Sequence, residues 1–304
     1  MKSVNYLLLL LLATLWGPSF LFIKIAGEEM QPLTLAAFRI GIAAILLGIY
    51  VFVVKGQFVK NLSFWMHVAV SGFFAQGLPF VLINWGEQYI SSALAAILNG
   101  LTPLFTILIA HQATKTDKLN SFKVIGALFG FLGLCVLVSP SFQHGLTGST
   151  MGIIAVTLAA LSYAIALIYS KTFLQNSAPL TAPAGQLIMS SIYLIPMALF
   201  IETPDLSTYS WNTWIAVSFL AVLGTALAFV VYFKLLMRTN SSFVSQVTYL
   251  MPLFGVLLGY IFLNEELSGA SMLAGLIILM GLLISNQKKQ VQLPVQKVCT
   301  TPTC

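Results

Sequence analysis

Long apolar stretches separated by short connectors are the feature that most limits what this chain can fold into. Of its 304 residues, 59% are hydrophobic and only 7% are charged. Soluble domains carry about 25% charged residues, so this chain lacks the side chains needed to cover a surface in water. A soluble enzyme is therefore excluded. The composition predicts an all-α integral membrane protein, because a helix satisfies its own backbone hydrogen bonds in lipid.

Ten apolar stretches approach the length of about 20 residues that a helix needs to cross a bilayer. The first of them follows Lys2 and imitates a signal peptide, but no small-residue cleavage site comes after it. It is therefore expected to remain as an uncleaved span. The expected spans are Asn5–Ala26, Pro32–Val54, Phe64–Gly86, Ser92–Gln112, Lys123–Ser139, Met151–Lys171, Leu180–Ile201, Trp211–Leu236, Phe243–Leu263 and Ser268–Ser285.

Basic and acidic residues alternate between successive connectors. Twelve of the 14 Lys and Arg residues fall on one side of the expected bundle, and seven of the eight Asp and Glu residues fall on the other. Because basic loops stay in the cytoplasm, this pattern predicts a multi-pass protein of the bacterial inner membrane with both termini cytoplasmic. The net charge of +6 is spread along the chain, so it does not indicate a nucleic-acid partner.

The two halves of the sequence resemble each other. The Pro-Leu-Thr triplet at 32–34 recurs at 179–181, and the Pro-Leu-Phe triplet at 103–105 recurs at 252–254. Each half holds five expected spans, and an odd number means that the second copy enters the membrane upside down. Inverted repeats of this kind build alternating-access transporters. The expected domains are two inverted five-helix repeats, 1–143 and 144–285, followed by a disordered cytoplasmic tail, 286–304.

Motifs add to this pattern. Trp16-Gly17 lies in the first span, Arg39 in the second, and Pro103 and Pro252 in the fourth and ninth. This combination resembles the EamA-type transporters of the drug/metabolite transporter superfamily. The stretch 264–268, Asn-Glu-Glu-Leu-Ser, is similar to that family's Gly-Glu-x-Leu-Ser turn, with Asn in place of the Gly, and the corresponding turn in the first half has Asp117 in place of the Glu.

The resemblance implies a secondary transporter that exports amino acids or related small metabolites, and it leaves the substrate open. The implied partners are a small-molecule substrate and the lipid bilayer, and a homodimer stays an open possibility. No cofactor motif or metal-ligand spacing occurs, so neither a cofactor nor a metal is expected. A channel or facilitator is the main alternative. A membrane-embedded enzyme would need His, Asp or Glu clustered at one depth, and the sequence has no such cluster.

Polar and aromatic side chains near the middle of a span are the candidates for a substrate site, because burying them in lipid is costly. Trp16 lies near the midplane beside Gly17-Pro18, and Tyr163 lies 147 residues later at the equivalent position. These two rings are expected either to sandwich a substrate or to pack in the core.

Amide side chains form the second group of candidates. Gln76 and Asn84 share the third span, where they can line a cavity or hydrogen-bond between helices. Asn99 precedes Pro103 in the fourth span, and Gln246 and Tyr249 precede the equivalent Pro252 in the ninth. Polar segments interrupted by proline at equivalent places in two repeats indicate a binding site. The fifth and tenth spans are expected at the periphery.

Arg39 is the one charged residue placed deep in an expected span, about 10 Å from its outer end at 1.5 Å per residue. Gln186 occupies the equivalent position in the second half. One interpretation is that the side chain of Arg39 reaches outward to Glu87 or Glu28. The other is that it faces the cavity and binds a substrate carboxylate through two parallel hydrogen bonds.

Overall fold

The computed structural model describes residues 2–55, 61–90, 92–114, 117–142, 149–175, 180–254 and 269–286. Within these ranges the long elements are all helices, which confirms the predicted all-helical fold. Seven of the described helices are long and apolar enough to cross a membrane: Ser3–Gly27, Pro32–Val53, Leu62–Gly86, Leu94–Ala113, Thr150–Phe173, Thr181–Ile201 and Trp211–Arg238. Two shorter apolar helices, Ser121–Leu137 and Met272–Ser285, coincide with the expected fifth and tenth spans. Part of the ninth span, the turn at 264–268 and the tail from 287 lie outside the described residues.

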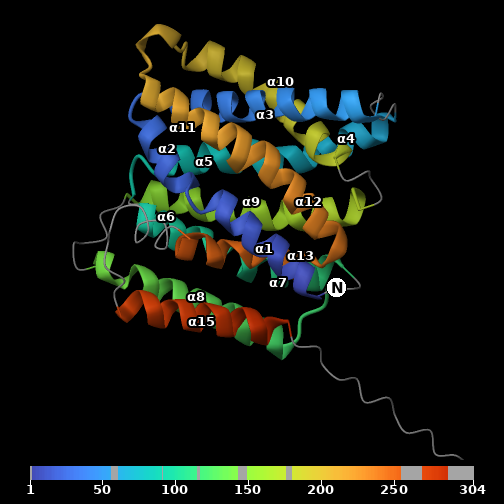
Figure 1. The fold of residues 1–304 in the computed structure, drawn as a ribbon, viewed down its shortest axis with the longest axis vertical. Helices are drawn as coiled ribbons and strands as arrows, with labels where there is room; N and C mark the ends of the chain where they lie inside the picture. The colour runs from blue at the N-terminus through green and yellow to red at the C-terminus, as the bar shows by residue number, and fades with distance from the viewer. Residues whose placement is uncertain are drawn as a thin grey trace, which may run out of the picture.

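The helices lie side by side, and the connectors gather at the two ends of the bundle (Figure 1). The central helix is α9 (Thr150–Phe173), which packs against α5 (Leu78–Gly86), α6 (Ser92–Asn99) and α7 (Thr102–Ala113). On one flank, α3 (Pro32–Lys55) packs along α10 (Thr181–Ile201). The third, fourth and ninth spans therefore pack against α9.

Three spans are broken into two helices each. The first consists of α1 (Lys2–Trp16) and α2 (Ser19–Gly27), which meet at Gly17-Pro18. Proline has no N–H to donate and interrupts a helix at such a point. The fourth span breaks between α6 and α7, just before Pro103, and the ninth breaks at Gln246, between α13 (Ser241–Ser245) and the helical residues 247–254.

Two further spans contain a π-helical turn instead of a break. In the third span, η1 (Phe73–Gly77) joins α4 (Leu62–Gly72) to α5. In the eighth, η3 (Val222–Leu227) joins α11 (Trp211–Ala221) to α12 (Ala228–Arg238). Both α4 and η1 begin 149 residues before α11 and η3, which is the offset between the two halves of the sequence. A π turn leaves backbone carbonyls without their usual helical donor and often occurs at functional sites.

A close helix pair forms one edge of the bundle. The helices α8 (Ser121–Phe142) and α15 (Gly269–Ser285) lie together at the bottom of Figure 1, which agrees with the expected periphery of the fifth and tenth spans. Their backbones approach so closely that a Cβ at Gly126 would lie 2.5 Å from the carbonyl oxygen of Gly281. Small residues therefore permit this contact, as is common between membrane helices.

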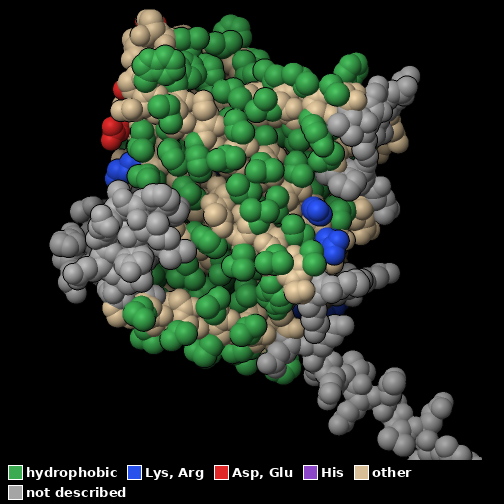
Figure 2. Space-filling model, viewed as in Figure 1, with side chains coloured by type: hydrophobic (Ala, Val, Ile, Leu, Met, Phe, Trp, Pro, Cys, Tyr) green, Lys and Arg blue, Asp and Glu red, His purple; other side chains and the backbone are tan. Residues whose placement is uncertain are grey.

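The surface of the bundle is apolar between its two ends. Figure 2 shows hydrophobic side chains covering the visible flank, with acidic side chains at one end and most of the visible Lys and Arg side chains at the other. Ile45, Leu132 and Phe200 are among the large apolar residues that are more than half exposed. An apolar belt of this kind is suited to lipid rather than to water.

Carboxylates from one half of the chain cap helices of the other half at the acidic end. Glu202, which follows α10, accepts hydrogen bonds from the backbone N–H groups of Leu33 (2.9 Å) and Thr34 (2.6 Å) at the start of α3. Glu29, which follows α2, accepts from the Thr213 hydroxyl (2.6 Å) and the Ser210 N–H (2.7 Å) at the start of α11. The Thr213 hydroxyl, with Ser210, lowers the pKa of Glu29. Negative charge at a helix N-terminus is favourable, so these contacts join the two halves.

We predict that Gly126→Ala lowers the stability of the protein by about 1–3 kcal/mol, because the added Cβ would overlap backbone atoms of α15. The matched control is Gly275→Ala on α15, where a Cβ would lie 3.8 Å from Leu253, an ordinary contact distance. Melting temperatures of the purified proteins in detergent measure both effects. Equal melting temperatures for the two variants would contradict the close packing of α8 on α15.

Candidate functional site

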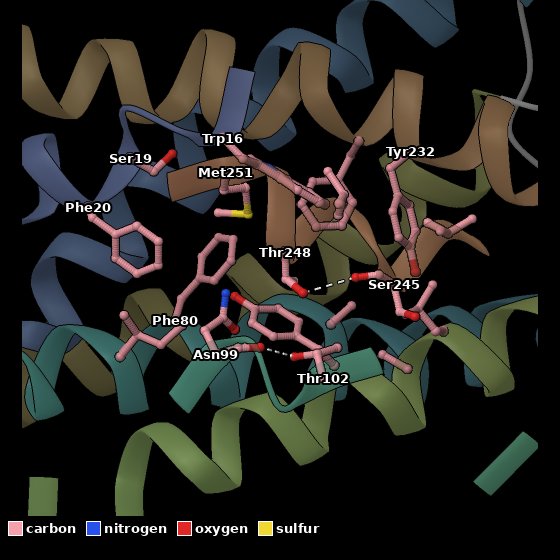
Figure 3. Close-up of a pocket in the computed structure, with 18 of the residues that line it drawn as sticks. Trp16, Ser19, Phe20, Phe80, Asn99, Thr102, Tyr232, Ser245, Thr248 and Met251 are labelled. Carbon is pink, nitrogen blue, oxygen red and sulfur yellow. Dashed lines mark hydrogen bonds between the residues drawn. The ribbon is translucent and has the colours of Figure 1, made fainter. Parts of the chain in front are cut away.

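A cavity lies at the centre of the bundle, where the first, fourth and ninth spans face α9 (Figure 3). About 780 Å³ of space among its lining residues is not filled by protein atoms, a figure that includes open solvent. The lining is mostly apolar and aromatic with a few polar groups, which is typical of small-molecule sites. Five of the nine residues proposed from the sequence line it: Trp16, Arg39, Asn84, Asn99 and Tyr163.

Aromatic rings form much of the cavity wall. The ring of Trp16 lies 6.0 Å from those of Phe229 and Tyr232, and Phe20, Phe80 and Tyr163 complete the aromatic lining. The indole N–H of Trp16 donates to the carbonyl oxygen of Gly224 (2.9 Å), within the π turn η3. Trp16 therefore both lines the cavity and supplies a donor to a carbonyl in this turn.

Arg39 is buried in the same wall, with only 4% of its surface exposed. Its Nε donates to the Thr225 hydroxyl (2.8 Å) and one terminal nitrogen donates to the Gly224 carbonyl (3.2 Å). The guanidinium lies over the ring of Phe80, 3.9 Å from its centroid. The hydrogen bonds of the side chain stay inside the protein, where η3 offers acceptors and Phe80 offers a π face. The charge of Glu87 also acts on the guanidinium, so the interpretation that Arg39 reaches toward Glu87 or Glu28 stays a prediction.

Three polar atoms in the cavity wall are buried without a hydrogen-bond partner: Ser19 Oγ, Asn84 Oδ1 and Asn99 Oδ1. Their residues are each about 95% buried. Buried polar groups in folded proteins are nearly always hydrogen-bonded. Three unpartnered atoms on residues that line one cavity therefore indicate a place where a ligand or water supplies the missing partners.

The other four residues proposed from the sequence lie outside this cavity lining. Gln76 donates to Gln186 (3.3 Å), and Gln186 donates to the hydroxyls of Ser71 (2.7 Å) and Ser170 (3.2 Å). Together with the two serines, Gln76 and Gln186 form a second buried polar cluster, which lies between α4, η1, α9 and α10.

Gln246 and Tyr249 instead attach the ninth span to the edge pair. Gln246 donates to the Ser285 hydroxyl at the end of α15. The Tyr249 hydroxyl donates to the carbonyl oxygen of Ala127 on α8 (2.9 Å), and its ring lies against Gly130. These side chains are used in helix contacts, which explains why they do not face the cavity.

The two polar clusters occupy equivalent positions in the two halves of the sequence. Arg39 corresponds to Gln186 at an offset of 147, and Gln76 corresponds to Thr225 at an offset of 149. In both clusters, the residue from the second or seventh span is bonded to a residue within the π turn of the opposite half. The offset of 147 pointed to Gln186, and the offset of 149, applied to Gln76, would also have identified Thr225.

Several lining residues carried no signal in the sequence. Ser19, Thr102, Ser245 and Thr248 are small hydroxyl residues in apolar runs. Such residues usually bond to their own helix backbone, as Thr102 and Thr248 do here with Asn99 (2.7 Å) and Ser245 (3.0 Å). Only the tertiary structure distinguishes Ser19, whose hydroxyl has no such partner.

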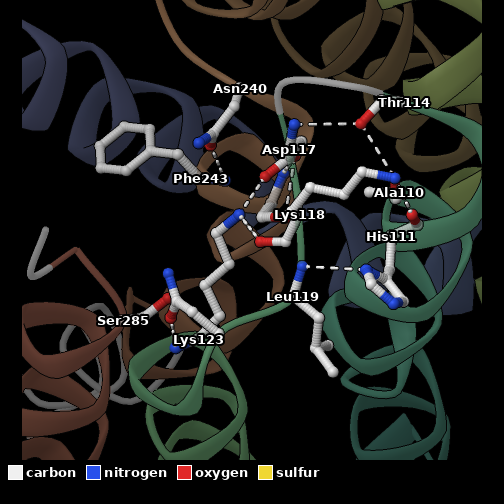
Figure 4. A network of polar contacts seen from close by, with 12 residues as sticks. Ala110, His111, Thr114, Asp117, Lys118, Leu119, Lys123, Asn240, Phe243 and Ser285 are labelled. Carbon is white, nitrogen blue, oxygen red and sulfur yellow. Dashed lines mark hydrogen bonds and ion pairs between the residues drawn. The ribbon is translucent and has the colours of Figure 1, made fainter. Parts of the chain in front are cut away.

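A buried ion pair holds the start of the ninth span, which then runs along the cavity (Figure 4). Asp117, in the connector before α8, pairs with Lys123 at 2.5 Å. Its other oxygen accepts from the backbone N–H (3.0 Å) and the hydroxyl (2.9 Å) of Ser242 in α13. Asp117 thus ties a connector of the first half to a cavity-lining span of the second half.

Comparison with known proteins decides the family. The model of the EamA-like transporter family matches residues 4–139 and again residues 150–287. The chain belongs to this family. It is therefore a multi-pass membrane transporter of the drug/metabolite transporter superfamily, as the motifs around Trp16 and Arg39 indicated.

Relatives of similar length support this assignment. An uncharacterised transporter of Archaeoglobus fulgidus is 27% identical over 95% of this chain and 99% of its own. The probable amino-acid metabolite efflux pump of Escherichia coli is 26% identical over 94% of this chain and 95% of its own. A solved crystal structure with 19% identity superimposes with a TM-score of 0.77 over 93% of this chain and 96% of its own, which shows a shared fold.

We predict that Asp117→Ala lowers the stability by about 3 kcal/mol, because it leaves Lys123 buried without its partner charge. The double change Asp117→Ala with Lys123→Met should recover most of that loss, since it removes the uncompensated charge. Melting temperatures of the single and double variants in detergent measure both effects. A double variant no more stable than Asp117→Ala would argue against a buried ion pair.

Proposed function

We propose that this EamA-family transporter exports amino acids or related small metabolites across the cytoplasmic membrane by alternating access. The observation that carries the proposal is the position of Arg39. A fixed positive charge lies in the wall of a central cavity whose lining is mostly aromatic and apolar. The apolar wall suits a hydrocarbon or aromatic side chain, and the guanidinium suits a carboxylate.

The surroundings of Arg39 favour a role in binding over one in stability alone. A charge near mid-bilayer costs about 2.5–3.5 kcal/mol on insertion scales. The hydrogen bonds that Arg39 makes to Thr225 and Gly224 go to a hydroxyl and a carbonyl, which are neutral acceptors, and they use two of its five N–H donors. A carboxylate arriving from the cavity would add charge-assisted hydrogen bonds, which are roughly twice as strong as neutral ones.

Ser19 extends the same part of the wall. A Cβ built on Gly224 would lie 3.2 Å from Ser19 Oγ and 3.7 Å from a terminal nitrogen of Arg39, so the hydroxyl and the guanidinium flank one small space. The Ser19 hydroxyl has no partner among the described residues. It is available to donate a further hydrogen bond to a bound carboxylate.

Alternating access follows if the two halves are inverted repeats of five spans each, with boundaries near residue 143. The double match of the family model supports a duplication. The equal spacing of the two π turns supports it independently. In such carriers one repeat rocks against the other around a site at their interface. The Arg39–Thr225 and Gln186–Gln76 contacts lie between the halves, so both would change during that movement.

Export as the direction of transport rests on the comparison. The Escherichia coli relative is called a probable amino-acid metabolite efflux pump. Among the described residues, no carboxylate lies in the cavity lining, so a central acidic proton relay is not part of the proposal. Exchange driven by the substrate gradient is sufficient for a carrier of this kind.

The role of Arg39 can be tested in liposomes containing the purified protein. We predict that Arg39→Gln weakens the apparent affinity for a carboxylate-bearing amino acid about 10- to 100-fold, because a charge-assisted contact of about 1.5–3 kcal/mol is lost. Counterflow of labelled leucine and phenylalanine measures this and also separates a carrier from a channel. The control is Arg238→Gln at the exposed end of α12. Unchanged affinity in a well-folded Arg39→Gln protein would rule out carboxylate binding by this residue.

The proposed inversion and orientation make a second prediction. Ser63 and Asn212 are exposed at the starts of α4 and α11, at equivalent positions 149 residues apart. In a background without native cysteines, we expect Asn212→Cys to react with an impermeant thiol reagent added to intact cells, whereas Ser63→Cys reacts only after lysis. Labelling of both sites from outside would contradict the inversion, and labelling of Ser63→Cys alone would reverse the orientation.

A further inference from the structure

Two hydrogen-bond acceptors in the cavity have no donor. They are the amide oxygens of Asn84 on α5 and Asn99 at the end of α6. Both residues line the cavity and both are about 95% buried. Arg39, Trp16 and Ser19 hold donor groups in the same wall, so the acceptors are chemically distinct from the part of the site that suits a carboxylate.

One amide is oriented by a hydrogen bond of its own. The Nδ2 group of Asn84 donates to the carbonyl oxygen of Pro32 at the start of α3 (3.2 Å), and its Oδ1 has no partner. The backbone carbonyl of Asn99 accepts from the Thr102 hydroxyl (2.7 Å) at the break between α6 and α7. Figure 3 shows the Asn99 side chain projecting beside Phe80 into the cavity.

We infer that Asn99 and Asn84 bind the protonated amine of the cargo, so that the transporter selects zwitterions over simple carboxylates. An ammonium group carries three N–H donors and no acceptor, so it supplies the kind of partner that these amide oxygens lack. A second carboxylate or an oxo group would place acceptor against acceptor and leave these oxygens unsatisfied. This inference rests on the proposed function and adds the amine to the carboxylate already assigned to Arg39.

Neutral amides suit this task in a membrane carrier. A carboxylate in place of Asn99 would bind an ammonium more strongly, but it would remain charged and buried in the empty carrier, which is costly in the membrane. An amide oxygen is a strong acceptor that carries no net charge. Sites that hydrogen-bond a substrate group discriminate strongly against analogues that lack it, because the buried polar groups are then left unpaired.

The test uses the full chain, purified in detergent, and two series of three probes. Each series contains an apolar amino acid, its 2-oxo acid without the amine, and its amine without the carboxylate: leucine, 4-methyl-2-oxopentanoate and 3-methylbutylamine, and phenylalanine, phenylpyruvate and phenethylamine. Ligand-induced shifts of the melting temperature over a range of concentrations give the dissociation constants. For the unaltered protein we expect the amino acid to bind at least tenfold more tightly than either analogue.

The variants separate the two halves of the site. Asn99→Leu should abolish the preference for the amino acid over its oxo acid while leaving oxo-acid binding within about twofold. Asn99→Asp should keep or increase that preference, because it restores an acceptor. A role of Asn99 in packing alone would not distinguish the two probes. Asn212→Leu, at an exposed position of α11, is the matched control and should leave all ratios unchanged. If Asn99→Leu fails to fold, Asn84→Leu and Asn99→Asp supply the same comparison.

The outcomes distinguish this inference from the proposed function. If the amino acid binds and Arg39→Gln weakens it, but Asn99→Leu and Asn84→Leu keep the preference over the oxo acid, the amine site is overturned and the proposed function stands. If oxo acid and amino acid bind the unaltered protein equally, the inference also fails, because the asparagines then bind water. If no probe of either series binds, both the inference and the export of apolar amino acids are overturned.

Discussion

The constraint on which this structure depends is that backbone groups in lipid must find partners within the protein. The Gly224 carbonyl lies in the π turn η3, and two side chains from other spans donate hydrogen bonds to it: Trp16 and Arg39. The same turn positions the Thr225 hydroxyl, which donates to the carbonyl of Leu220 (2.7 Å) and accepts from Arg39. The irregular backbone therefore sits beside the cavity, where polar atoms are tolerated, and it fixes the one charged group in the cavity wall.

This arrangement also couples the two halves of the chain. Arg39 belongs to the first half and η3 to the second, while the neutral counterparts Gln186 and Gln76 cross in the opposite sense. At the ends of the bundle, Glu29, Glu202 and Asp117 each cap a helix of the other half. The Arg39–Thr225 contact carries a charge, whereas the Gln186–Gln76 contact is neutral. Under the proposed alternating access, the two conformations would therefore differ in their affinity for an anionic group.

Individual residues show which parts of the candidate site could be predicted from the sequence. Trp16, Asn99 and Tyr163 were proposed as site residues because aromatic or polar side chains near the middle of a span are costly to bury in lipid. All three line the cavity. Gln246 and Tyr249 satisfied the same criterion, yet they bond to α15 and α8. A sequence gives the depth of a residue along its span. Which way the side chain points depends on the rotation of the helix and on its neighbours, and these are set by packing across the whole bundle.

The sequence by itself determined that the chain is a bundle of membrane helices that resembles the EamA-type transporters, because scarce charge excludes a soluble fold and the motifs around Trp16 and Arg39 lie in its spans. It also determined which polar residues lie within the membrane. Only the tertiary structure decided that Arg39 bonds to η3 and that Asn84 and Asn99, which line one cavity, keep unpaired oxygens. The physical reason is that these outcomes depend on donors and acceptors from other spans, which lie up to 186 residues away in the chain.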